Sequence, residues 1–178
     1  HLWEIDQVHR VPLVLMVCKG CGLCQLDRTV PQDWMYRHYW YKSGVNESMR
    51  AELHDIVQEA RELVEVGATH GVLDIGANDG TLLSYYASTH GHGPTPYRYA
   101  VEPALNLQEE LKQHADTVIP DYFPFTNSPH LPQFRIITAV AMAYDLEDPV
   151  AFFQAVHDLL ATGGVAVIQF QDLAQQLA

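Results

Sequence analysis

The segment at residues 71–80, "GVLDIGANDG", constrains the fold more than any other part of the chain. A short apolar run leads into Gly76 and Gly80, and "TLLSYYAS" follows with apolar residues suited to a helix. Glycine lets the backbone bend and approach a ligand more closely than a residue with a Cβ atom would. The segment therefore predicts a buried strand, a tight turn and a helix that starts at about Asp79.

Strands and helices are expected to alternate along the chain after residue 45. A helix comes first, capped by Asn46 and ended by Gly67, over the apolar stripe Met49, Leu53, Ile56, Val57, Ala60, Leu63 and Val64. Strands are then expected at "YRYAVEP", "DTVIP", "FRIITAVAM" and "VAVIQF", helices at "ALNLQEELKQH" and "DPVAFFQAVHDLLA", a turn at "TGG" and a helical start in the final "QDLAQQLA". This alternation is typical of right-handed crossovers, so the predicted fold class is α/β with a doubly wound, mostly parallel sheet.

Polar side chains that suit a nucleoside follow three of the predicted strands. In open α/β sheets the ligand binds beyond the carboxyl ends of the strands. The first strand end carries Asp74, Gly76, Asn78, Asp79 and Gly80, the second carries Glu102 and Pro103, and the third carries Asp121 and Tyr122. Glu102 can accept both ribose hydroxyls, while Asp121 and Tyr122 can bond to and stack on an adenine. Because carboxylates near the glycine turn suit an ammonium or sulfonium, the pattern predicts a pocket for S-adenosylmethionine.

All three cysteines, Cys18, Cys21 and Cys24, lie in the stretch "CKGCGLC". Cysteines packed so closely are typical of thiolates kept reduced for a metal, which favours a cytoplasmic location. Structural zinc usually takes four ligands, so the cluster is one ligand short and His9 is a candidate helper. We expect a partial zinc-binding module and linker at residues 1–45 and the main domain at 46–178.

Charge and hydropathy argue against several classes of partner. The chain holds 10 Lys and Arg against 22 Asp and Glu, a formal net charge of −12, which would repel a nucleic acid backbone. Its longest apolar run, "VPLVLMVC", is far shorter than a membrane span. The first residues lack the pattern of a signal peptide and are interpreted as a cut end. A small-molecule substrate is therefore expected, with neither nucleic acid nor membrane as partner.

The sequence also resembles the class I methyltransferases, and within them a sugar C-methyltransferase group that carries an N-terminal zinc-binding module. The resemblance runs through "C-x-x-C-G-L-x-Q-L" at 18–26, "Y-x-Y-x-S-G" at 39–44, "S-M-R" at 48–50, "I-G-x-N-D-G" at 75–80, "E-P-x-x-N" at 102–106 and "D-P" at 148–149. It implies methylation of a carbon next to a keto group on a nucleotide-linked deoxysugar. In such chemistry a base removes the acidic proton and the carbanion attacks the sulfonium methyl.

The resemblance assigns further residues and also shows departures from the family pattern. It implies that Cys18 and Cys21 are half of a structural zinc site, with Cys24 as a substitute ligand, so we expect weak or no zinc binding by this chain alone. Tyr39 and Tyr41 match positions that touch cofactor or substrate, although aromatic packing explains them as well. The chain ends before the histidine segment associated with the base, Asp145 replaces a frequent histidine, and Gln169 lies where a strand-end acid is expected.

Other readings stay open at this point. A methyltransferase acting on another small-molecule oxygen or nitrogen would need no enolate, and a noncatalytic binding or scaffold module would keep the fold without turnover. An NAD-dependent oxidoreductase shares the topology, but Asn78 stands where the dinucleotide fingerprint G-x-G-x-x-G has its middle glycine.

Overall fold

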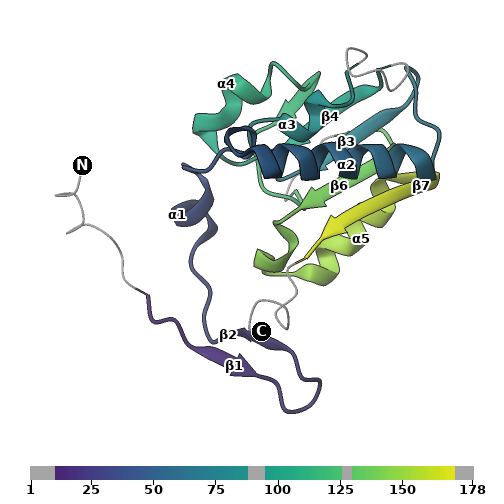
Figure 1. Cartoon of the computed structure of the whole chain (residues 1–178). Coiled ribbons are helices and arrows are strands. Elements are labelled where there is room, and N and C mark those ends of the chain that lie inside the picture. Colours follow the sequence, from purple (N-terminus) through teal and green to yellow (C-terminus); the bar gives the residue numbers. More distant parts are fainter. Residues whose placement is uncertain (1–10, 88–94, 126–129, 171–178) are drawn as a thin grey trace.

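The computed structural model describes residues 11–87, 95–125 and 130–170 of the 178-residue chain, so His9 and the final "QDLAQQLA" lie outside the described part. A hairpin of β1 (Leu15–Val17) and β2 (Cys24–Leu26) is followed by a linking segment with α1 (Gln32–Tyr36) and η2 (Ser43–Val45) (Figure 1). The α/β body consists of α2 (Glu47–Leu63), β3 (Gly71–Ile75), α3 (Thr81–Ser84), β4 (Tyr97–Val101), η4 (Leu105–Leu107), α4 (Gln108–Leu111), β5 (Thr117–Ile119), β6 (Phe134–Val140), η5 (Ala143–Asp145), α5 (Pro149–Leu159) and β7 (Leu160–Gln169).

The central sheet has five parallel strands in the order β5-β4-β3-β6-β7. Asp74 on the middle strand, β3, pairs with Ala100 of β4 on one side and with Thr138 of β6 on the other. The chain runs outward from β3 to β5 and then returns to form β6 and β7, so the strand order reverses between β3 and β6. The predicted doubly wound, parallel α/β sheet is confirmed for the described residues.

The strands send alternate side chains into two cores, one on each face of the sheet. Val72 belongs to the core that contains the buried residues of α2, whereas its neighbour Leu73 belongs to the core that contains those of α5. Ile136 and Ile137 of β6 divide in the same way. Because both faces are covered, the strands are almost entirely apolar, and their polar ends are held at one edge of a rigid sheet.

The two long helices begin as the sequence predicts. The Asn46 side chain accepts a hydrogen bond of 3.0 Å from the Ser48 N–H at the start of α2. Asp148 accepts one of 2.9 Å from the Ala151 N–H at the start of α5. α2 ends at Leu63, before the expected Gly67, because Val64 turns to extended backbone and packs into the core with Val66.

Two expected elements differ in detail. The helix predicted after β4 consists of the short η4 and α4. The predicted "TGG" turn lies inside β7, where the register against β6 shifts between Phe134 and Ile136. Gly163 there has φ +71°, and a Cβ on Gly164 would lie 2.9 Å from the Arg135 carbonyl oxygen, so glycines permit a bulge where a turn was expected.

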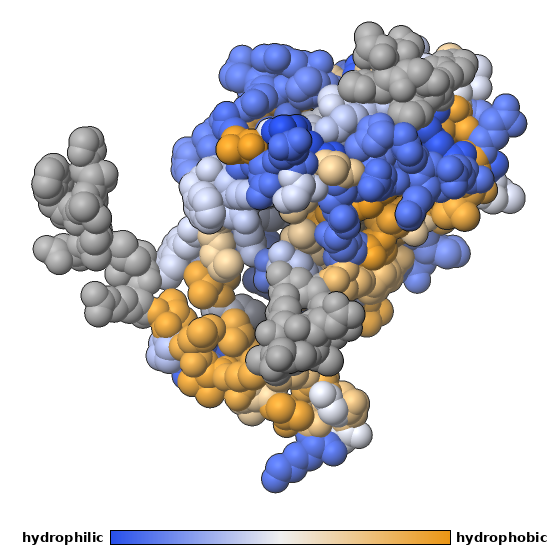
Figure 2. Space-filling view, viewed as in Figure 1, coloured by the Kyte–Doolittle hydropathy of each residue, from blue (hydrophilic) through white to orange (hydrophobic). Residues whose placement is uncertain are grey.

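The N-terminal hairpin carries Cys18 and Cys21 at its turn and Cys24 at the start of β2, and it presents an apolar surface (Figure 2). Cys18 and Cys21 are exposed, and Cys24 is half-buried. Among the described residues, no group of three or more His, Cys, Asp or Glu side chains is placed to hold a metal ion. The expected partial zinc module is therefore a hairpin of three-residue strands, without a metal site that the described residues complete. Nor does any described helix have the length and hydropathy to cross a membrane.

Candidate functional site

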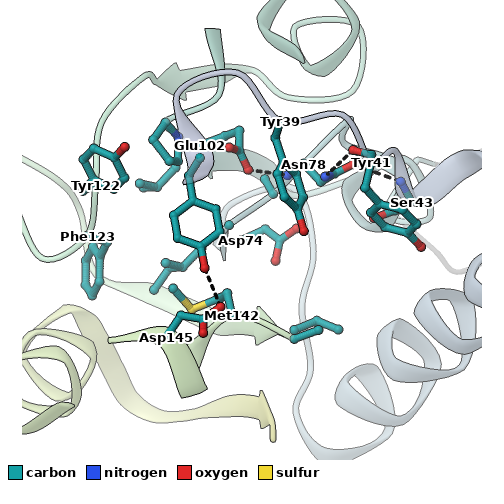
Figure 3. Close-up of a pocket in the computed structure, with 18 of the residues that line it drawn as sticks. Tyr39, Tyr41, Ser43, Asp74, Asn78, Glu102, Tyr122, Phe123, Met142 and Asp145 are labelled. Atoms are coloured by element: carbon teal, nitrogen blue, oxygen red, sulfur yellow. Dashed lines mark hydrogen bonds between the residues drawn. The ribbon is translucent and has the colours of Figure 1, made fainter. Parts of the chain in front are cut away.

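A cavity of about 380 Å³ opens at the carboxyl edge of the sheet, around the point where the strand order reverses. Nine of the residues expected to touch cofactor or substrate line it, namely Tyr39, Tyr41, Asp74, Gly76, Asn78, Glu102, Pro103, Asp121 and Tyr122. Figure 3 labels six of them: Tyr39, Tyr41, Asp74, Asn78, Glu102 and Tyr122. This volume falls in the range typical of small-molecule sites. The parallel sheet thus brings residues from three strand ends to one cavity.

Asp74 lies at the base of the cavity and is only 3% exposed. Its Oδ1 accepts a hydrogen bond of 2.6 Å from the Thr138 hydroxyl of β6. Burial raises the pKa of Asp74 to about 7, although the Thr138 hydrogen bond opposes the rise. A cationic group bound beside Asp74 would favour its charged form.

The glycine turn places Gly76 against the loop that follows β6. Gly76 has φ +73°, and a Cβ at this position would lie 3.0 Å from Cγ of Met142. A side chain is therefore excluded by both backbone conformation and space. Ala141, next to Met142, itself has φ +54°, which is uncommon for alanine and leaves Ala141 lining the cavity.

Asn78 connects the turn to the neighbouring strand and to the linking segment. It has φ +52°, a left-handed conformation that asparagine tolerates. Its side-chain nitrogen donates a hydrogen bond of 3.1 Å to the Tyr41 carbonyl oxygen, and its side-chain oxygen accepts one of 2.9 Å from the Ser43 N–H. Its own backbone N–H donates 2.8 Å to Glu102. A glycine here could make only the last of these contacts.

Glu102 is held firmly at the end of β4. One carboxylate oxygen accepts from the Asn78 N–H and the other from the Ala104 N–H, both at 2.8 Å. Burial raises the pKa of Glu102, and these two backbone hydrogen bonds oppose the rise. Since a carboxylate has about four acceptor positions, lone pairs remain for two hydroxyl donors.

Two of the expected cofactor residues, Asp79 and Gly80, are not among the residues that line the cavity. The Asp79 carboxylate accepts hydrogen bonds from the Gly44 N–H at 2.8 Å and from the Thr81 hydroxyl at 2.6 Å. Gly80 has φ +83°, and a Cβ there would lie 2.9 Å from Cβ of His114. Both residues therefore shape the turn and fasten the linking segment to it.

The residues after β5 contact the first helix of the linking segment. Tyr122 donates a hydrogen bond of 2.9 Å to Asp33, and the Arg37 guanidinium lies 4.9 Å from its ring centre. Burial raises the pKa of Tyr122 to about 12, and the hydrogen bond to Asp33 adds to the rise. Asp121 accepts from the Tyr122 N–H, which holds this turn in place.

Residues 36–45, which we call the strap, lie across the cavity. Tyr39 and Asn106 exchange two hydrogen bonds, of 2.9 Å and 2.8 Å, and Arg50 donates 2.6 Å to the Gly44 carbonyl oxygen. Tyr39 and Tyr41 each line the cavity, and both also pack against Trp40. The two tyrosines therefore both pack within the strap and face the cavity.

Sequence reasoning missed Tyr36 as a lining residue and noted Asp145 only as a departure from the family pattern. The Tyr36 hydroxyl donates a hydrogen bond to the Asp145 carboxylate, although 109 positions separate them. Tyr144 and Met142 complete this end of the cavity. The aromatic density of "WMYRHYWY" was the available signal, but it does not say which rings face a ligand.

A parallel sheet of this strand order, with a glycine turn and an acid at the next strand end, is the architecture of a Rossmann-like domain. A model of the methyltransferase domain family matches residues 43–178, and the chain belongs to that family. It is 28% identical over 119 residues to the C-methyltransferase NovU of Streptomyces niveus. The matched region is 63% of this chain but only 26% of NovU. The chain thus spans about a quarter of that relative.

Solved structures agree on the fold. The precorrin-6y C5,15-methyltransferase of Geobacter metallireducens matches with a TM-score of 0.54 at 13% identity, over 80% of this chain and 72% of that one. An S-adenosylmethionine-dependent methyltransferase of Clostridium acetobutylicum gives 0.52 at 18% identity, over 67% and 49%. The plantazolicin methyltransferase BpumL, solved with SAH, gives 0.56 at 14% identity, over 74% and 56%.

Proposed function

We propose that the cavity binds S-adenosylmethionine and that the protein transfers its methyl group to a small-molecule acceptor. The observation that carries the proposal is the Glu102 carboxylate, fixed by two backbone N–H groups at the end of β4 with lone pairs left for a ribose. Asp121 and Tyr122 would hold the adenine, and Asp74 and Gly76 would receive the amino acid part. When bound, the cofactor supplies an electrophilic methyl group on a sulfonium.

The charges of the cavity favour this cofactor over a dinucleotide. The charged side chains that line it, among the described residues, are all carboxylates. They suit the ammonium and sulfonium of S-adenosylmethionine, whereas the diphosphate of NAD would be repelled. Asn78 also fills the place of the glycine that a dinucleotide fingerprint requires. Asp79 and Gly80 would support this site indirectly, by holding the turn.

For the acceptor, we propose a nucleotide-linked keto-deoxysugar methylated on carbon. Support comes from the sequence motifs and from the similarity to NovU, which is a C-methyltransferase. A base must remove the acidic proton. Burial, with a smaller contribution from Asp145, raises the pKa of Tyr39, so Tyr39 would serve as a hydrogen-bond donor at neutral pH and not as that base. Tyr41 would act with it in positioning the acceptor.

The cofactor proposal is tested by calorimetry with S-adenosylmethionine and SAH. Binding of both, weakened by Glu102→Gln but not by the exposed Glu109→Gln, is expected. Absence of heat from a folded sample would sink the assignment. A screen with labelled methyl donor then compares keto-sugar nucleotides with phenols and amines. Transfer to phenols or amines alone would favour a different acceptor. No transfer to any of these compounds would favour a noncatalytic binding module.

We also propose that Cys18 and Cys21 form half of a structural zinc site, with Cys24 as a further ligand, in a protein of the cytoplasm. Hydrogen bonds from the backbone of Cys21 and then Gly20 lower the pKa of the Cys18 thiol, which favours the thiolate that binds a metal. This chain by itself is expected to retain little zinc. Stoichiometric zinc after dialysis against a mild chelator would contradict that expectation.

A further inference from the structure

One end of the cavity is left over when the proposed cofactor contacts are assigned. Those contacts use the ends of β3 and β4 and the turn after β5, which meet at Asp74, Glu102 and Tyr122. The remaining end follows β6 and is formed by Tyr36 and Tyr39 from the linking segment and by Tyr144 and Asp145 from η5. Figure 3 shows Asp145 at the end of the cavity beside Met142. On the proposed function, this end is the part of the cavity left for the methyl acceptor.

Asp145 lies among the three phenols of this acceptor end. The Tyr36 hydroxyl donates to its Oδ2 atom. Burial, followed by the Asp145 hydrogen bond, raises the pKa of Tyr36 well above its usual value, so the phenol keeps its proton and Asp145 stays the acceptor. The Asp145 charge also raises the pKa values of Tyr39 and Tyr144, after the larger effect of burial. Three tyrosines with protonated hydroxyl groups thus lie near one carboxylate.

Cations near the cavity are engaged elsewhere. The described lining includes no lysine, arginine or histidine. Arg37 pairs with Asp33 and stacks over Tyr122, and Lys42 pairs with Glu110. Among the described residues no lysine, arginine or histidine forms an ion pair with Asp145, which lines the cavity together with the aromatic rings.

Resting on the proposed function, we propose that the acceptor end binds a protonated amine, carried by the methyl acceptor as a recognition group between Asp145 and the rings of Tyr36 and Tyr39. Aromatic faces and a carboxylate both attract a cation. Tyr36 and Tyr39 are half-buried and Asp145 is exposed, so a cation can reach the carboxylate from solvent and rest against the rings. The rings of Tyr36 and Tyr39 lie 5.8 Å apart at 59°, so a cation between them can contact both. By the same charges, a phosphate is excluded from this end and must remain outside the cavity.

The test compares three sugars that differ in charge: glucosamine at mildly acidic pH, where its amine is protonated, glucose, and glucose 6-phosphate. Each is titrated into isotope-labelled protein saturated with SAH, and binding is followed by NMR. Glucosamine should bind roughly threefold to tenfold more tightly than glucose, and glucose 6-phosphate should bind most weakly. The proposal would be overturned if glucosamine bound no better than glucose, or if glucose 6-phosphate bound as tightly as glucosamine.

Variants separate this subsite from the cofactor site. Asp145→Asn keeps the shape and should abolish the preference for glucosamine, while SAH binding is unchanged. Tyr36→Phe keeps the ring and should retain part of the preference. Asp158→Asn, on the exposed face of α5, and Tyr97→Phe, at the exposed start of β4, are matched controls and should bind all three sugars as the wild type does. A full preference in Asp145→Asn would refute the subsite.

The same titration distinguishes failure of the two proposals. If SAH does not bind, the cofactor assignment fails, and the sugars are titrated into the protein alone. A preference for glucosamine that Asp145→Asn removes would still support the amine subsite. Equal binding of glucosamine and glucose, with and without SAH, would exclude the amine subsite. The cofactor assignment would then be decided by the SAH titration alone.

Discussion

The backbone N–H of Asn78 donates a hydrogen bond of 2.8 Å to Oε2 of Glu102, which fastens the glycine turn after β3 to the acid at the end of β4. The two residues are far apart in sequence but are neighbours because β3 and β4 pair in parallel, up to Ile75 and Val101. The position of the proposed ribose acid is therefore tied to the backbone of the turn.

Glu102→Gln is expected to weaken SAH binding roughly tenfold to a hundredfold. The charged oxygens that face the ribose hydroxyls are lost, and hydrogen bonds to a charged group contribute about 1.5–3 kcal/mol. Folding stability should fall as well, because the new amide group faces the N–H of Asn78 or Ala104. Calorimetry and urea unfolding measure the two effects. An unchanged affinity would show that Glu102 does not contact the cofactor.

Gly76→Ala is expected to lower the free energy of unfolding by more than the roughly 1–2 kcal/mol that a left-handed alanine costs. The additional loss comes from its Cβ, which would lie 3.0 Å from Cγ of Met142. Adding Met142→Ala should recover only that part. The control is Gly20→Ala, whose Cβ would meet only Cys18 Sγ at 3.8 Å. Urea unfolding distinguishes the three variants, and equal stability of Gly76→Ala and Gly20→Ala would contradict the strained turn.

The residues at the strand ends were predictable because a parallel sheet gathers its carboxyl ends at one edge. Asp74 lies near the end of a recognisable strand, and Glu102 and Tyr122 follow the next two, so strand assignment placed all three at the cavity. It was less predictable which residues of the glycine turn face the cavity and which hold the strap. The Asp79 carboxylate accepts a hydrogen bond from the Gly44 N–H of the strap, and that contact depends on how the linking segment docks.

Pairing across the cavity mouth was beyond local sequence patterns. Tyr36 and Asp145 meet only because α1 lies over the end of β6, and no spacing along the chain encodes that approach. The bulge in β7 was missed for a related reason. Glycines in "TGG" are equally compatible with a turn and with a strand that shifts register, and pairing with β6 decides between them.

Asn78→Gly is expected to loosen the strap while leaving the turn intact, because glycine also adopts positive φ. The hydrogen bonds to Ser43 and Tyr41 are lost, and each normally contributes about 0.5–1.5 kcal/mol. The Ser43 amide should therefore exchange with solvent roughly ten times faster. Asn106→Ala provides the comparison, since it should expose the Tyr39 amide and leave Ser43 protected. Equal protection of Ser43 in both variants would show that Asn78 does not hold the strap.

The affinity for SAH is expected to rise with pH between about 5 and 7 and then level off, because burial raises the pKa of Asp74 to about 7. In the free protein below that pH the carboxyl is mostly protonated. A bound ammonium favours the charged carboxylate, so binding must release a proton, and affinity gains at most about tenfold per pH unit. Folding stability depends on pH in the opposite direction. The Asp74 carboxyl loses its proton more easily in the unfolded chain than in the folded protein, so its contribution to stability is present below about pH 4 and is lost as the pH rises towards 7. Asp74→Asn should flatten both profiles, whereas Asp158→Asn should leave them unchanged. A pH-dependent affinity that survives in Asp74→Asn would assign the proton to another group.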